Sequence, residues 1–168
     1  MKEAGILLHI SSLPGKYGVG TLGKCAYDFV DFLKKSGQKV WQILPIGPTS
    51  YGDSPYSSTS AFAFNPYFID LDLLVEDGLL EKEDLPYPFT VNRVNYDYLY
   101  VNKYPILHKA YLKSNIYKKE FEKFIKDENS WLDDYAMFVA IKEWQGGKPW
   151  YEWYDNEKKR NPESLLWP

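Results

Sequence analysis

The chain has 168 residues, a length typical of one domain or of a large part of a bigger one. Its hydrophobic fraction of 45% and its charged fraction of 26% are ordinary for a globular protein and argue against disorder or a membrane-spanning chain. The net charge of −3 disfavours a nucleic acid as the main partner, because polyanions bind cationic surfaces.

Aromatic side chains are unusually abundant. They make up 18% of the residues, with 15 tyrosines, nine phenylalanines and six tryptophans. Aromatic rings stack on the apolar faces of sugars, and the tyrosine hydroxyl adds a hydrogen-bonding group. The same rings also fill hydrophobic cores, and we expect most of them to do so here.

Cysteine and histidine are scarce. The single Cys25 excludes an internal disulfide framework, and we expect it to be a small buried side chain in a helix. His9 and His108 are far apart in the sequence, so neither a metal site nor a cofactor is predicted. The apolar run 6–10 is too short for a signal sequence or a membrane span. We therefore expect a cytoplasmic protein that has no membrane partner.

The first elements predict a β-α-β unit. Residues 4–10 form a continuous apolar run, which is typical of a strand buried on both faces in a parallel sheet. A glycine-rich loop follows, and its match to the phosphate-binding pattern G-x-G-x-x-G at 18–23 is weak because it does not directly follow the strand. An amphipathic helix is predicted over 22–36, with Gly37 as its left-handed C-terminal residue. Residues 40–44 then predict a second strand, parallel to the first.

The stretch 45–60 predicts a structured loop. It contains three prolines and two glycines, which exclude a continuous helix or strand, and it has little apolar content in its second half. Its own hydrogen bonds and turns must therefore hold it together. Its tyrosines, its hydroxyls and a single carboxylate, Asp53, suit a neutral polyhydroxylated ligand such as a sugar. From the residues alone, Asp53 is also a candidate catalytic group.

Mostly helical structure is predicted after this loop. Residues 61–71 are apolar and are expected to end near a strand or an extended segment, and 72–80 predict a short helix. The pattern over 96–126 is helical, with Pro105 marking a kink or a first turn.

A last helix is predicted over 131–143, with Ser130 as its N-cap. Because residues 135–141 are all apolar, we expect it to be buried on more than one side.

Strand, helix and strand in this order correspond to the opening of a β/α barrel, which has eight strands and about 250 residues when closed. An incomplete parallel sheet exposes its edges. We therefore interpret the sequence as the front part of a longer fold, which needs the remaining barrel or self-association to be stable.

Several motifs together resemble one known family. They are GILLHISSLPG (5–15), WQILPIGPT (41–49), YGDSPY (51–56), SAFAFNP (60–66), LDDYAMF (132–138) and GGKPW (146–150). In combination they are similar to the N-terminal signatures of 4-alpha-glucanotransferases, also called amylomaltases or disproportionating enzymes, of glycoside hydrolase family 77. The likeness runs from Gly5 to about Trp153.

This resemblance implies an α/β fold, the N-terminal part of a (β/α)8 (TIM) barrel with an inserted helical subdomain. Residues 1–71 would supply the first β/α units and the sugar-site loop, and residues 72–168 the mostly helical insertion. The family transfers a segment of an α-1,4-glucan to the 4-hydroxyl of glucose or another glucan by a retaining double displacement, which uses two carboxylates ~5–5.5 Å apart. The resemblance places those carboxylates beyond residue 168, so we expect this chain to be inactive alone.

The resemblance also assigns roles to residues of the loop. Tyr56 corresponds to a tyrosine that contacts the sugar beside the cleavage point, and Ser54 to a nearby serine. Tyr51 corresponds to a tyrosine of a second glucan-binding groove, and Asp53 becomes a residue that shapes the loop near the sugar site. Either tyrosine could instead pack the loop onto the domain.

The partners implied are maltodextrins and other α-1,4-glucans. A non-catalytic glucan-binding remnant and a fragment of a related α-glucan hydrolase are the alternative functions.

Overall fold

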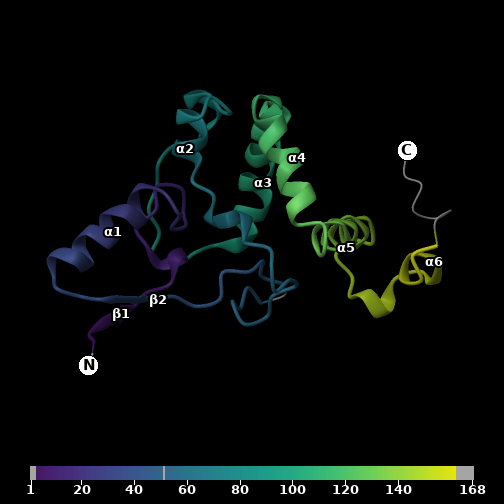
Figure 1. Cartoon of the computed structure of the whole chain (residues 1–168), viewed down its shortest axis with the longest axis horizontal. Coiled ribbons are helices and arrows are strands. Elements are labelled where there is room, and N and C mark those ends of the chain that lie inside the picture. Colours follow the sequence, from purple (N-terminus) through teal and green to yellow (C-terminus); the bar gives the residue numbers. More distant parts are fainter. Residues whose placement is uncertain (1–2, 51, 162–168) are drawn as a thin grey trace. The chain divides into compact units, whose positions relative to one another are not determined.

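The computed structural model describes residues 3–50 and 52–161 (Figure 1). The chain divides into two compact units, Met1–Lys118 and Lys119–Pro168. Within the described ranges, the first unit holds both strands, and the second consists of helices and turns. No helix in these ranges is long and apolar enough to cross a bilayer.

The first unit opens with the predicted β-α-β arrangement. Strands β1 (Gly5–Leu7) and β2 (Val40–Gln42) pair in parallel, and helix α1 (Lys24–Lys35) lies between them in the sequence. Figure 1 shows α1 beside the strand pair, and the Phe29 ring of α1 meets the Trp41 ring of β2 at 5.0 Å between centroids. The prediction of a parallel pair is confirmed.

The strands are shorter and more exposed than predicted. Instead of 4–10 and 40–44, each strand spans three residues, and the chain turns into a 3-10 helix, η1 (Ile10–Ser12), soon after β1. Leu7 of β1 is 56% exposed, so the prediction of strands buried on both faces is wrong for this chain. A two-stranded sheet has two open edges, and the helix beside it covers only part of the pair.

Helix α1 starts two residues later than predicted because Leu22 is held outside it, donating its backbone N–H to Phe68 O at 2.9 Å. The helix ends as expected. Gly37 has a φ of 72°, in the left-handed region, and the next amide, of Gln38, donates to Leu33 O at 2.9 Å. Cys25 is half-buried rather than buried.

Two clusters of buried side chains form the core of the first unit. His9 packs beside the first cluster, with its ring edge-on to Phe68 at 5.3 Å. The first cluster comprises Ile10, Leu13, Val19, Ala26, Tyr67, Phe68 and Leu99. The second comprises Tyr17, Leu71, Leu79, Leu80 and Ala110.

The segment after the loop forms helical turns, and no strand forms near residue 71. Ile69 and Asp70 have extended backbone conformations, as the extended-segment alternative predicts. Asn65 accepts a hydrogen bond from the Tyr67 amide, and with Pro66 it starts the 3-10 helix η2 (Pro66–Phe68). Asp70 then caps helix α2 (Leu71–Glu76) by accepting from the Leu73 amide at 3.1 Å. The 3-10 helix η3 (Lys82–Asp84) follows. Capping by these side chains outweighs the extended preference of the apolar run.

The helical stretch predicted over 96–126 is interrupted. Helix α3 (Tyr96–Leu112) contains Pro105 and is followed by the 3-10 helix η4 (Ser114–Tyr117) and by helix α4 (Lys118–Asp127). Asn95 caps α3 by accepting from the Tyr98 amide.

The second unit contains helix α5 (Leu132–Trp144), the 3-10 helix η5 (Trp150–Glu152) and helix α6 (Asp155–Lys158). Trp131, not Ser130, precedes the first residue of α5, and it makes no side-chain cap. Among the residues of α5 only Ile141 is buried, so burial on more than one side is also wrong. So small a unit has few side chains with which to cover a helix that is apolar all round.

Candidate functional site

The loop 45–60 is held by its own polar groups, as the sequence predicts. Thr49 and Ser58 form an antiparallel bridge, and the Thr59 amide donates to Pro48 O at 3.3 Å. The Ser58 hydroxyl donates to Ser60 O at 2.7 Å. At Gly47 a Cβ would lie 2.3 Å from Ser58 Oγ, so only glycine fits where the two sides of the loop meet.

A turn with left-handed backbone conformations forms the tip of the loop. Gly52 and Asp53 have φ values of 82° and 53°, and the Asp53 amide donates to Ser50 O at 3.0 Å. Aspartate tolerates this left-handed conformation better than most residues do. Tyr51, predicted to belong to a second glucan-binding groove, lies outside the described residues.

Beside the loop, Asp53 lines a pocket of about 380 Å³ whose facing wall is the first half of α3. Tyr67 contacts Tyr104 at 5.5 Å and Tyr96 at 5.8 Å between ring centroids, and Tyr100 contacts Tyr104 at 5.5 Å. We name this hollow the tyrosine pocket. Its lining residues are Pro48, Thr49, Ser50, Gly52, Asp53, Asn65, Tyr67, Tyr96, Asp97, Tyr100 and Tyr104.

Asn65 brings an unsatisfied donor to this lining. Its side chain is 3% exposed, and Oδ1 accepts from the Tyr67 amide at 3.0 Å. Because this bond fixes which way the amide group points, Nδ2 is the remaining donor, and it has no hydrogen-bond partner within the described part of the chain. Buried polar groups normally have partners, and because Nδ2 has almost no accessible surface, a buried water fits it better than a ligand does.

Asp53 is the carboxylate that the loop contributes to the tyrosine pocket. Burial and the nearby carboxylate of Asp97 raise the pKa of Asp53, and a hydrogen bond with Thr49 partly opposes this. Burial also raises the pKa of Tyr67 and of Tyr96, so both phenols stay protonated through the neutral range. The pocket therefore offers protonated hydroxyls and rings, with acidic groups at one side.

Ser54 and Tyr56, predicted as sugar contacts, do not line the tyrosine pocket. The Ser54 hydroxyl accepts from the Tyr56 amide at 3.3 Å, which shapes the turn. The Tyr56 side chain is 74% exposed. Such an exposed ring does not pack the loop onto the domain, which was the alternative role for Tyr56.

Sequence reasoning missed Asn65, Tyr67 and the α3 tyrosines as members of one site. A signal existed in part, because Tyr96, Tyr100 and Tyr104 recur every four residues and share one helix face. Nothing in the spacing indicates that this face turns toward a loop some 40 residues earlier in the chain.

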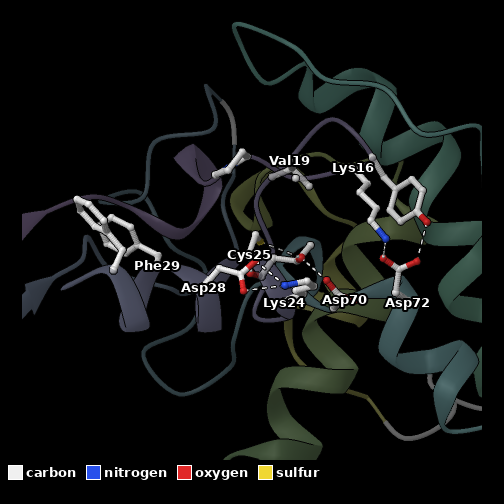
Figure 2. Close-up of a pocket in the computed structure, with 13 residues that line it drawn as sticks. Lys16, Val19, Lys24, Cys25, Asp28, Phe29, Asp70 and Asp72 are labelled. Carbon is white, nitrogen blue, oxygen red and sulfur yellow. Dashed lines mark hydrogen bonds and ion pairs between the residues drawn. The ribbon is translucent and has the colours of Figure 1, made fainter. Parts of the chain in front are cut away.

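A second cavity, of about 410 Å³, lies between α1 and the start of α2 (Figure 2). Its charged groups satisfy one another. Lys16 pairs with Asp72 at 2.7 Å, Tyr17 donates to the same carboxylate at 2.8 Å, and Lys24 pairs with its helix neighbour Asp28. These pairs leave few polar groups to bind a ligand, so the cavity is a weaker candidate than the tyrosine pocket.

The glycine pattern at 18–23 has a packing explanation in this region. Asp70 lies so close to Gly23 that a Cβ there would fall 2.1 Å from Asp70 Oδ2. The same carboxylate accepts from the Thr21 hydroxyl at 2.5 Å. A carboxylate of the chain itself thus occupies the start of α1, where a phosphate would have to bind.

A parallel β-α-β unit followed by helices defines an α/β protein. The comparisons with known proteins give the family. A family model described as 4-alpha-glucanotransferase matches residues 8–166. The chain belongs to this family, as the resemblance of its motifs predicts.

Relatives of known name agree. The chain is 53% identical to the 4-alpha-glucanotransferase of Clostridium butyricum over 162 residues, which cover 94% of this chain and 33% of the relative. It is 49% identical to that of Thermus thermophilus, covering 96% of this chain and 33% of the relative. A solved structure, amylomaltase from Streptococcus agalactiae in complex with acarbose, matches with a TM-score of 0.89 and 44% identity, covering 98% of this chain and 34% of that one. The chain therefore spans about a third of the length of these relatives.

Proposed function

We propose that this chain forms the sugar-binding front of a 4-alpha-glucanotransferase. The complete activity would transfer a segment of an α-1,4-glucan to the 4-hydroxyl of glucose or another glucan by a retaining double displacement. Residues 1–71 would be the first β/α units of a (β/α)8 barrel together with the sugar-site loop, and 72–168 the helical insertion. Membership of the family and the parallel pair β1–β2 support this proposal.

The observation that carries the proposal is the tyrosine pocket beside the loop. Its rings supply flat apolar surfaces for pyranose sugars, and hydroxyl, amide and carboxylate groups line the same hollow. A neutral, polyhydroxylated chain such as a maltodextrin matches both kinds of group.

Loop residues take distinct roles in this proposal. Tyr56 and Ser54 contact the sugar next to the cleaved bond, Tyr51 belongs to a further glucan-binding groove, and Asp53 holds the tip of the loop. None of these is a catalytic residue. The two carboxylates of the retaining mechanism, ~5–5.5 Å apart across the scissile bond, are assigned to residues outside 1–168.

Incubation of the purified chain with maltotriose tests this assignment. We expect no glucose and no longer maltodextrins, while maltoheptaose should shift the NMR resonances of the pocket tyrosines. Glucose together with longer products would place the catalytic carboxylates within this chain. Glucose and maltose without longer products would support the hydrolase alternative. Absence of maltoheptaose binding would refute the proposed role of the tyrosine pocket.

Activity of the complete protein separates transfer from binding alone. Conversion of maltotriose into glucose and longer maltodextrins is the expected result. A complete protein that binds maltoheptaose but leaves maltotriose unchanged would instead be the non-catalytic glucan-binding alternative.

A further inference from the structure

A buried lysine crosses from α3 to the segment that carries Asn65 and Tyr67. The Lys103 side chain is 3% exposed, and Nζ donates to Tyr67 O and to Ile69 O, both at 2.7 Å. Lysine is almost never buried so completely unless its charge has partners. Here the partners are two backbone carbonyls rather than a carboxylate, so the bonds fix a backbone position directly.

The segment that receives these bonds is anchored from other sides as well. The backbone N–H of Asn65 donates to Ile46 O, at the start of the loop, at 2.8 Å. The backbone N–H of Leu22 donates to Phe68 O at 2.9 Å. These bonds hold the segment against the β-α-β unit. Lys103 adds the polar tie to α3.

Lys103 lies next to Tyr104 in the sequence, and Tyr100 lies three residues before it, about one helical turn. Tyr100 and Tyr104 form the α3 wall of the tyrosine pocket, and Tyr67 and Asn65 belong to the facing wall. The ammonium therefore connects the helix of one wall to the backbone of the other. If this tie lengthens, the rings of Tyr67 and Tyr104, now 5.5 Å apart, lose their edge-to-face contact.

We propose that Lys103 is a positioning residue for glucan binding, because its ammonium sets the spacing between α3 and the Asn65–Tyr67 wall of the tyrosine pocket. This inference rests on the proposed function, since it takes the pocket to be a glucan site. Lys103 itself does not touch the sugar.

The protonation state of Lys103 provides a second, independent test of its role. Burial lowers the pKa of Lys103 to about 8, while Asp70, which precedes α2, and Cys25 of α1 act in the opposite direction. Tyr67 and Tyr96 keep their protons in this range, since burial raises the pKa of both. A Cys25→Ser background removes the thiol that acts electrostatically on Lys103. In that background, a change between about pH 7 and about pH 9.5 reports mainly on the ammonium.

The experiment compares three variants of the full chain in the Cys25→Ser background, which serves as the parent, with tyrosine rings labelled with ¹³C and maltoheptaose as the probe. Lys103→Met keeps the aliphatic stem and removes the charge, and Lys103→Arg keeps a charge. Lys109→Met is the matched control, because Lys109 is on the same helix but is exposed and pairs with Asp84 away from the pocket.

We expect Lys103→Met to weaken maltoheptaose binding about tenfold, as for loss of a hydrogen bond from a charged group, and Lys109→Met to leave it unchanged. Binding by the parent chain should weaken by a smaller factor with a midpoint near pH 8, because the neutral amine keeps two N–H donors but loses the charge that strengthens both bonds. Lys103→Met should lose this pH dependence. Lys103→Arg should remain independent of pH over the same range, because its guanidinium stays charged.

The ring resonances test the positioning separately from binding. Those of Tyr67 and Tyr104 should move in Lys103→Met and at the same midpoint in the parent chain, while that of Tyr27, which is outside the pocket, stays fixed. Failure of the parent chain to bind maltoheptaose would overturn the proposed function, and the ring resonances would still decide the positioning. The inference would be overturned if the Tyr67 and Tyr104 resonances changed neither with the substitution nor with pH. If Lys103→Met failed to fold, the pH titration of the parent chain alone would decide.

Discussion

We expect the free energy of unfolding to increase when the pH is raised from about 7 to about 9.5, because Lys103 is charged at a cost in the folded chain. Burial lowers its pKa from 10.5 to about 8. A group whose folded pKa lies below its unfolded pKa contributes stability that is complete above the unfolded pKa and is lost as the pH falls through the folded one. For Lys103 the window therefore extends from about 10.5 down to about 8.

The magnitude follows from the two pKa values. Full protonation of the buried amine costs about 3 kcal/mol relative to a solvated lysine, since each pKa unit corresponds to about 1.4 kcal/mol. According to the linkage relation, the free energy of unfolding rises by about 2 kcal/mol between about pH 7 and about pH 9.5 as the amine loses its proton. Lys103→Met should remove this gain, although it leaves Tyr67 O and Ile69 O without their donor at a cost of roughly 1–3 kcal/mol each.

Urea unfolding followed by circular dichroism measures this difference. The parent chain and Lys103→Met are compared at each pH, at two protein concentrations so that any association is accounted for. Lys16 has a raised pKa and is present in both proteins, so its contribution cancels in the difference. Parallel pH profiles for the two proteins would refute the reasoning. Glucan affinity should move the opposite way with pH, which separates the stability of the fold from the geometry of the pocket.

Three further outcomes are expected. Asp53→Asn should raise the melting temperature at neutral pH and flatten the pH dependence of that temperature below neutrality. The pKa of Asp53 is raised in the folded chain, so the stability that the protonated carboxyl contributes is lost as the pH rises through the folded pKa. Equal melting profiles for the two proteins would contradict this. Gly47→Ala should cost about 1–3 kcal/mol in urea unfolding by overpacking against Ser58, and adding Ser58→Gly should recover part of it; no loss in the single variant would refute the close approach. Sedimentation velocity should show concentration-dependent association through the open edges of β1 and β2, whereas a monomer that melts cooperatively would argue against it.

Features fixed by short-range chemistry were predictable from the sequence. The parallel pairing follows from an apolar run, an amphipathic helix and a second apolar run in close succession. Glycine at position 37 ends α1 as predicted, because its left-handed conformation suits a helix C-terminus. The loop 45–60 is held by hydroxyl and backbone groups that belong to the loop itself, so its composition alone indicated how it is stabilised.

Predictions that depended on burial failed. Apolar runs predicted strands and a helix α5 buried on several sides, but burial depends on what other elements cover a surface. In the same way, the strand expected near residue 71 gave way to η2 and α2, since Asn65 and Asp70 cap helical turns there. A hydrophobic pattern states what should be covered, and it does not state what is available to cover it.

The sequence by itself determined the β-α-β opening, the self-supported loop and, through its motifs, the family. These depend on neighbouring residues or on strings of residues that are read directly. Only the tertiary structure decided that Asp53 faces Tyr67 and the α3 tyrosines, and that Lys103 bonds to carbonyls more than 30 residues away. Such contacts arise when helix and loop pack together, and no periodicity along the chain encodes which side chains then meet.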